Sequence, residues 1–135
     1  MAIFGIGAFY DRDVSNEFIT KGIACIGWNE NEAPTLHNIL RFLRTGDILY
    51  IKSHSPQVGL VIKGVGIVTD NQLNTYPNLG TGVKVKWIWT GYEEIGKITE
   101  LDDKYNVRNI SIYEEFNKFV QDKVVSLLTG KINAT

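Results

Sequence analysis

The chain has 135 residues, a hydrophobic content of 44%, a charged content of 21% and a formal net charge of −1. This length and composition are typical of one globular domain that buries a core without disulfide or metal support. The near balance of 14 basic and 15 acidic residues argues against tight nonspecific binding to duplex DNA, which requires a basic excess. Local recognition of a single nucleotide stays open.

Cysteine usage and apolar runs limit the class of protein further. The one cysteine, Cys25, lies in an apolar run, which predicts a small buried side chain rather than a disulfide. The N-terminus lacks the basic and apolar regions of a signal peptide, and no apolar run approaches the roughly 20 residues of a membrane span. We therefore expect a cytoplasmic protein that does not contact a membrane.

Hydrophobic periodicity, caps and turn residues divide the chain into strands and helices. The first predicted elements are a strand over 2–8, a helix capped by Asp13 and ended by Gly22, a strand over 23–28 and a helix from Pro34 to Gly46. The later ones are strands over 47–53, 58–68 and 83–89, a loop over 70–82, a connecting segment over 96–103 and a helix from a Ser111–Glu114 capping box to Gly130. The short separations between strands predict an α+β fold, a small β-barrel of mostly antiparallel strands flanked by helices.

Two pairs of glycines carry expectations of their own. Gly5 and Gly7 alternate along the first strand, so one of its faces is bare and open to the close approach of a backbone or a ligand. Gly64 and Gly66 lie inside the strand over 58–68 and predict a bend or a bulge there. Both pairs mark places where a strand departs from regular packing.

The predicted strand over 47–53 ends in the polar cluster Ser53-His54-Ser55. Strand ends that open into polar loops often carry binding groups, and histidine offers a donor, an acceptor and a charge that changes near neutral pH. With a hydroxyl on each side, the cluster suits the edge of a small heterocycle. The alternative is a solvated turn before Pro56, and the sequence leaves both interpretations open.

The three tryptophans fall into two groups. Trp87 and Trp89 share a strand face with two valines, which favours core packing, although an indole can also stack on a base. Trp28 closes a strand and is followed at once by a polar loop that begins at Asn29. Its indole is therefore a candidate ligand contact, with core packing as the alternative.

Catalytic and metal-binding constellations do not stand out. Ser53 and His54 are adjacent on a strand and point to opposite faces, so they cannot easily act as nucleophile and base. His37 and His54 are the two imidazoles and Cys25 stands alone, which gives no metal-ligand spacing. We expect His37 on the exposed side of its helix. The sequence thus predicts no catalytic residue, no metal and no cofactor.

Several short motifs occur together in the chain. They are Gly27-Trp28-Asn29, an amphipathic helix, Gly46-Asp47-Ile48-Leu49-Tyr50, Ser53-His54-Ser55, Gly64-Val65-Gly66-Ile67-Val68 and Tyr76-Pro77-Asn78. In this order they resemble the EVE domain of the PUA-like superfamily, which also contains the YTH and ASCH domains. Ile26-Gly27-Trp28 and Val85-Lys86-Trp87-Ile88 also resemble the EVE-like specificity domains of modification-dependent restriction enzymes. The resemblance covers residues 3–90.

The resemblance implies a single EVE/PUA-like domain over 1–135, a small β-barrel with a pocket that accepts a modified base, in which residues 97–135 form a C-terminal helical extension. By position, Trp28 and Asn29 match the family's tryptophan-containing turn. The run Ser53-His54-Ser55 matches its His-Ser strand end. Tyr50-Ile51-Lys52 stands where the family often has aromatic residues directly before that strand end.

The leading hypothesis is a binding module rather than an enzyme. It would hold a modified or flipped base of DNA or RNA in a pocket lined by Trp28, Asn29, Ser53, His54, Ser55 and Trp89. The alternative is a sensor or interaction domain that binds a nucleotide-like small molecule or a protein partner, which the lack of a basic excess favours. An enzyme acting on nucleic acid ranks last, because no paired carboxylates stand beside a base or a metal cluster.

Overall fold

The structure is a computed structural model that describes residues 1–97 and 110–130. In chain order its elements are β1 (Ile3–Gly7), α1 (Ser15–Lys21), β2 (Ile23–Ile26), α2 (Pro34–Phe42), β3 (Ile48–Ser55), β4 (Gly59–Tyr76), β5 (Gly80–Gly96), β6 (Ile112–Glu114) and α4 (Lys118–Thr129). The strands form one sheet in the order β2-β5-β4-β3-β1-β6. Among the described helices, none is long and apolar enough to cross a membrane.

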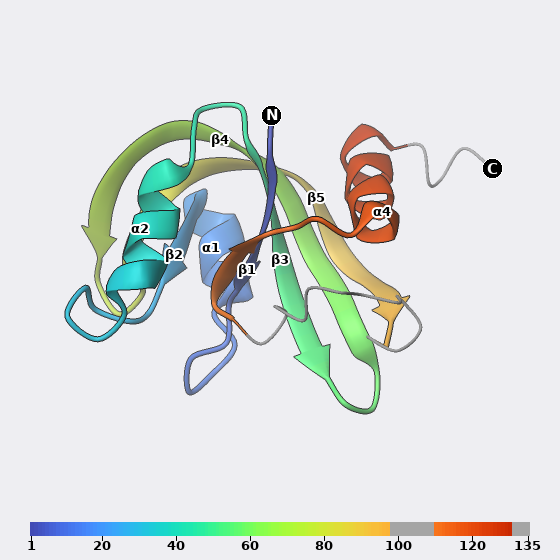
Figure 1. Cartoon of the computed structure of the whole chain (residues 1–135), viewed down its shortest axis with the longest axis horizontal. Coiled ribbons are helices and arrows are strands. Elements are labelled where there is room, and N and C mark those ends of the chain that lie inside the picture. The colour runs from blue at the N-terminus through green and yellow to red at the C-terminus, as the bar shows by residue number, and fades with distance from the viewer. Residues whose placement is uncertain (98–109, 131–135) are drawn as a thin grey trace.

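The sheet curls into a half-barrel. Strands β1 and β3 are parallel, and the other neighbouring pairs are antiparallel. The long strands β4 and β5 curve together around one side of the molecule, with the described helices packed about the sheet (Figure 1). The expected α+β fold, a small barrel-like sheet of mostly antiparallel strands with flanking helices, is confirmed.

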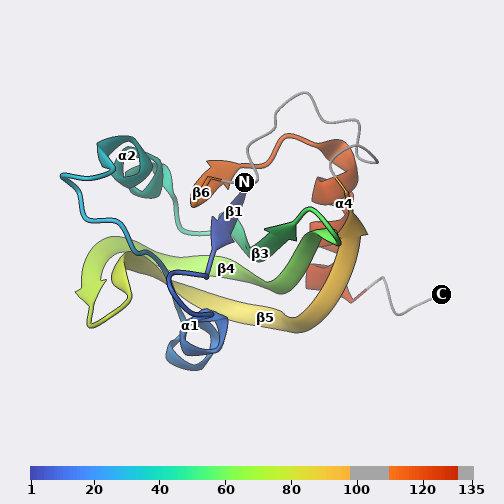
Figure 2. The ribbon, with the colours of Figure 1, turned by 90° about the horizontal axis from the view of Figure 1, so that it is seen from below.

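Two buried clusters lie on opposite faces of β3, because side chains alternate along a strand. Leu49 and Ile51 belong to the larger cluster, together with residues of α1 and α2. Ile48 and Tyr50 belong to the second cluster, which α4 covers. Accordingly, α1 and α4 lie on opposite sides of the ribbon formed by β4 and β5 (Figure 2). Burial on both faces explains the continuous apolar run at the start of β3.

The bare face of β1 is covered by side chains of β3 and β6. A Cβ atom on Gly5 would lie 2.6 Å from Cζ and Oη of Tyr113 and 2.8 Å from Cζ of Tyr50. These two rings meet edge to face at a centroid distance of 6.3 Å, and their hydroxyls lie 2.7 Å apart. At Gly7 the side chain of Lys52 takes the corresponding space. The close approach expected at this face is made by the protein's own side chains.

A buried polar network joins β3 to the start of α4. The Tyr50 hydroxyl donates to the carboxylate of Glu115, which is 2% exposed. The other oxygen of that carboxylate accepts from the backbone N–H of Asn117 at 3.0 Å. Burial, with Tyr113 and Glu115 close by, raises the pKa of Tyr50 well above its ordinary value. The network therefore ties the C-terminal segment to the centre of the sheet through bonds that water does not weaken.

The predicted irregularity in the fourth strand is confirmed. The pairing of β4 with β5 changes register between Ile62 and Gly64 and again between Val65 and Gly66. On its other side β4 pairs with β3, where Ile51 lies opposite Gly64 and Lys52 lies opposite Ile62. Lys63 is therefore the extra residue of a bulge in β4.

The prediction of a loop over 70–82 is wrong. Strand β4 continues to Tyr76 and β5 begins at Gly80, which leaves a tight turn around Asn78 with a φ of 64°. Two of the glycines that indicated a turn, Gly80 and Gly82, lie instead in β5, beside β2. A Cβ atom on Gly82 would stand 2.1 Å from the carbonyl oxygen of Ala24. The missing side chain therefore serves a close approach of two backbones rather than a loop.

The capping box predicted at Ser111–Glu114 is also wrong. Residues Ile112–Glu114 form β6, which pairs with the edge of β1, and that pairing outcompetes the local helix signal. The helix begins at Lys118, where the Asn117 side chain accepts from the N–H of Val120 at 3.1 Å.

Of the expected extension over 97–135, the described part thus supplies a strand and a helix. Of the connecting segment predicted over 96–103, residues 98–103 lie outside the described residues.

We predict that Gly5→Ala destabilises the protein more than Gly7→Ala does. The new methyl group at position 5 meets two rings that hydrogen bonds hold in place, and such overpacking costs about 1–3 kcal/mol. At position 7 the methyl group would stand 3.4 Å from the flexible Cε of Lys52, an ordinary contact. Urea unfolding of both variants measures the difference. Equal losses of unfolding free energy would contradict this account of the β1 face.

Candidate functional site

A cavity opens where β1 and its parallel neighbour β3 separate. The last residue of β1 paired with β3 is Gly7, opposite Lys52, whereas β3 continues to Ser55. The cavity at this point has a volume of about 610 Å³. That volume lies within the roughly 300–1,000 Å³ typical of small-molecule sites.

Three of the six predicted ligand-binding residues line this cavity. They are Trp28, Ser53 and His54. The other three lie outside its lining: Asn29 borders a neighbouring hollow, the Ser55 hydroxyl accepts from the N–H of Val58 at 3.2 Å, and Trp89 packs half-buried against the second core cluster. The fold thus brings the tryptophan turn and part of the polar strand end to one place.

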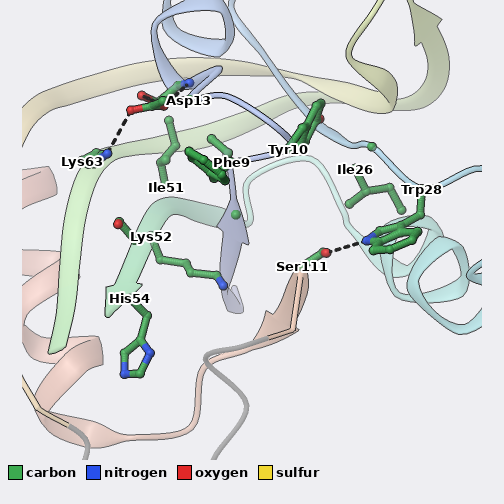
Figure 3. A pocket seen from close by; sticks show the side chains of 15 residues that line it. Phe9, Tyr10, Asp13, Ile26, Trp28, Ile51, Lys52, His54, Lys63 and Ser111 are labelled. Carbon is green, nitrogen blue, oxygen red and sulfur yellow. Dashed lines mark hydrogen bonds and ion pairs between the residues drawn. The ribbon is translucent and has the colours of Figure 1, made fainter. Parts of the chain in front are cut away.

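Trp28 is held through both its side chain and its backbone. Its Nε1 donates to Oγ of Ser111 at 3.1 Å, as Figure 3 shows. Its carbonyl oxygen lies 2.7 Å from Nε2 of His37. A carbonyl oxygen can only accept, so Nε2 carries the proton in this contact. The indole is therefore fixed in place although the residue is 51% exposed.

The expectation that His37 lies on the exposed side of its helix is wrong. His37 is 2% exposed and shares the inner side of α2 with Leu40. Helical spacing contains this signal, since the two residues are three positions apart and lie on one face. What spacing cannot supply is the partner of the imidazole, because the Trp28 carbonyl is brought to it by the tertiary fold.

Sequence reasoning did not single out the aromatic pair Phe9 and Tyr10, which comes one residue after the end of β1 and also lines the cavity. Phe9 is 71% exposed. The Tyr10 hydroxyl donates to the carbonyl oxygen of Leu79 at 2.6 Å. Its ring packs against Gly27, where a Cβ atom would lie 3.1 Å from it. Burial raises the pKa of Tyr10 far above its ordinary value, so the hydroxyl remains a donor. Their position just after a strand end was the available signal.

An ion pair lies on one side of the cavity. Nζ of Lys63 is 3.0 Å from Oδ2 of Asp13, and Oδ1 accepts from the N–H and the hydroxyl of Ser15 at 2.9 and 2.6 Å. Burial would raise the pKa of Asp13, but the Ser15 hydrogen bonds and the Lys63 ammonium outweigh it and hold that pKa below its ordinary value. Asp13 is therefore ionised at neutral pH.

Lys52 lies apart from that pair. Its Nζ is 6.0 Å from the ring centroid of Tyr113, within the range of a cation–π contact. Burial lowers the pKa of Lys52 to about 8. The ammonium is thus mostly protonated at neutral pH, although it has lost part of its hydration.

The cavity therefore combines three kinds of group. Aromatic rings offer stacking surfaces, hydroxyls and an imidazole offer hydrogen bonds, and lysine and aspartate offer charge. Among the described residues, no group of three or more histidine, cysteine, aspartate or glutamate side chains could hold a metal ion. This combination of aromatic, hydrogen-bonding and charged groups suits the binding of a planar, polar small molecule.

Comparisons with known proteins identify the fold. No protein-family model matches the chain, and no curated protein matches its sequence. A Pseudomonas putida protein solved by X-ray crystallography is 15% identical, with a TM-score of 0.58 over 94% of this chain and 99% of the other. A Rhodopseudomonas palustris protein solved by NMR is 10% identical, with a TM-score of 0.55 over 94% and 93%.

A third solved structure is the YTH domain of Mmi1. It is 13% identical to this chain, with a TM-score of 0.56 over 98% of this chain and 79% of the other. At such low identities the similarity shows the fold alone. The chain therefore has a fold similar to that of a YTH domain, in agreement with the PUA-like resemblance at the level of architecture.

We predict that His37→Leu destabilises the protein by about 1–3 kcal/mol, because the Trp28 carbonyl loses its buried donor. In His37→Gln the side-chain amide can donate in place of Nε2, so that variant retains most of the stability. Urea unfolding measures both changes, and the Trp28 indole N–H signal in the NMR spectrum of the ¹⁵N-labelled protein reports its environment. Equal stability of the leucine and glutamine variants would contradict the role assigned to this hydrogen bond.

Proposed function

We propose that the protein is a non-catalytic binding module that holds a flipped or modified nucleobase in the cavity beyond β1. One observation carries the proposal: Trp28 and His54, from two separate parts of the chain, line the same cavity of about 610 Å³. An indole can stack on an extruded base. An imidazole supplies a donor and an acceptor that match the polar edge of a base.

Stacking supplies the affinity. Phe9, Tyr10 and Trp28 bring aromatic rings to the cavity lining. Stacking of a base on an aromatic side chain is worth about 1–3 kcal/mol. Because the Ser111 and His37 contacts already fix Trp28, its ring needs little ordering when a ligand binds. Such preorganisation reduces the entropy lost on binding.

Polar and apolar groups together supply the discrimination. Ser53 and His54 offer hydrogen bonds, and a buried polar group without a partner costs about 1–3 kcal/mol. Ile26 and Ile51, both buried, form an apolar part of the same lining. A methyl group placed in an apolar pocket is worth about 1–3 kcal/mol. The lining therefore suits a base that carries a small added group.

We assign the chain to the EVE group of the PUA-like superfamily. The motifs Gly27-Trp28-Asn29 and Ser53-His54-Ser55 support this assignment. The similarity of its fold to the YTH domain of Mmi1 supports it at the level of architecture. On this assignment the ligand is a modified base in DNA or RNA, and the protein works by binding rather than by chemistry.

The test is a titration with oligonucleotides of DNA and RNA that carry adenine, cytosine or their methylated and hydroxymethylated forms. We expect at least one modified base to bind about tenfold more tightly than its parent, as one added group in a fitted pocket allows. Trp28→Ala should then lower the affinity by roughly 5- to 150-fold through loss of stacking. Fluorescence anisotropy measures both effects.

Phe42→Ala is the matched control, because Phe42 is 73% exposed on α2 and lies outside the cavity lining. It should bind as the unaltered protein does. If no modified base is preferred over its parent, the proposal is wrong. If free nucleosides bind as tightly as oligonucleotides, the site belongs to a sensor of nucleotide-like small molecules instead.

A further inference from the structure

A second hollow adjoins the cavity at the tryptophan turn. Gly27 and Trp28 belong to the lining of both, and the second hollow has a volume of about 620 Å³. The rest of its lining comes from the segment before α2, from α2 itself, and from the end of β4 and the start of β5. Residues of this lining include Glu30, His37, Leu73, Thr75 and Thr81.

The second hollow is built on paired strands and a helix. A Cβ atom on Gly80 would lie 2.1 Å from the carbonyl oxygen of Ile26 and 3.2 Å from Cα of Gly27, so the start of β5 touches the end of β2. Thr75 and Thr81 pair directly between β4 and β5, and their side chains therefore share one face of the ribbon. The turn between these strands and α2 lie at the same end of the molecule (Figure 1).

A buried imidazole in this lining has one nitrogen without a partner. His37 is 2% exposed, and its Nε2 donates to the Trp28 carbonyl oxygen at 2.7 Å. With the proton on Nε2, Nδ1 of the neutral ring is an acceptor. Among the described residues, Nδ1 has no hydrogen-bond partner. Because buried polar groups are nearly always hydrogen-bonded in proteins, this nitrogen indicates a donor from a ligand.

The charges of the lining indicate which kind of ligand group fits. Of the described residues that line the second hollow, none is a lysine or an arginine, and its carboxylate, Glu30, is paired with Arg41. A phosphate would find no positive side chain there. A neutral group with an N–H or O–H hydrogen can donate to His37, and Leu73 offers apolar surface beside it. A nucleoside combines such donors with an apolar ring face.

We propose that the second hollow binds the nucleoside next to the bound base in the same strand, and that Nδ1 of His37 accepts a hydrogen bond from it. This inference rests on the proposed function and names the ligand as a base within a strand. Trp28 borders both sites, and successive bases of a single strand can stack against aromatic side chains. The donor has two sources, the ribose 2′-hydroxyl or an N–H of the neighbouring base.

The probes derive from the modified-base oligonucleotide of the panel that binds most tightly. In one probe an abasic residue replaces the nucleoside on the 5′ side of the modified base, and in another it replaces the one on the 3′ side. We expect at least one replacement to lower the affinity about fivefold or more, the lower end of the range for one stacked base. Fluorescence anisotropy measures the change.

Two further pairs of oligonucleotides identify the donor at the sensitive position. One pair compares a ribose with a 2′-deoxyribose, and the other compares adenine or guanine with unsubstituted purine, which has no amino group. A loss of about fivefold or more in the first pair identifies the hydroxyl, and in the second it identifies the base. His37→Gln keeps a donor for the Trp28 carbonyl but removes the ring nitrogen Nδ1, so it should abolish the difference within that pair.

Two variants block the second hollow from outside the cavity. Thr75→Tyr places a ring in it from β4, and Thr81→Tyr does so from β5. In both, the probe that is abasic at the sensitive position should bind as before, and the intact oligonucleotide should lose its advantage over that probe. Thr69→Tyr is the matched control, because Thr69 is an exposed residue of β4 outside both linings. Urea unfolding of each variant establishes that it is folded before binding is compared.

Two results overturn the inference while leaving the proposed function intact. One is equal affinity of the intact oligonucleotide and both abasic probes, or equal affinity within both donor pairs. The other is an advantage of the intact oligonucleotide that survives in the folded Thr75→Tyr and Thr81→Tyr variants. A complete lack of modified-base binding in the oligonucleotide panel overturns the proposed function, and the inference with it.

Discussion

The bare face of β1 is the constraint on which the rest of the structure depends. Because Gly5 has no side chain, the rings of Tyr50 and Tyr113 can cross the strand and bring β6 onto its edge. The residue just before β6 is Ser111, which holds the indole of Trp28. The packing of one glycine thus positions an aromatic side chain at the cavity.

The end of the parallel pairing determines where that cavity forms. Beyond Gly7 the chain is no longer paired with β3, whose end stays paired with β4 alone, and both segments place side chains around the space between them. The scaffold below is rigid, because β3 is buried on both faces where it begins. Binding groups on loops and strand ends above a rigid sheet are a common arrangement in functional sites.

The sequence predicts the features of the fold that depend on residues close together in the chain. The α+β class followed from strand spacing and the bulge followed from Gly64. The two segments that meet at the cavity were indicated by an indole at the end of one strand and by polar residues at the end of another. The errors arose where distant segments meet. Pairing with β2 explains Gly82, pairing with β1 explains the strand at Ile112–Glu114, and the Trp28 carbonyl explains the burial of His37. No local pattern contains those partners.

The central claim is that the ligand binds beside Trp28. The three indoles offer separate reporters in the NMR spectrum of the ¹⁵N-labelled protein, because the Trp87 Nε1 donates to backbone carbonyls at 3.0 and 3.1 Å and Trp89 packs against the second core cluster. On saturation with the preferred modified-base oligonucleotide, the account predicts that the Trp28 indole signal shifts while those of Trp87 and Trp89 stay in place. Saturated binding with an unmoved Trp28 signal would contradict it.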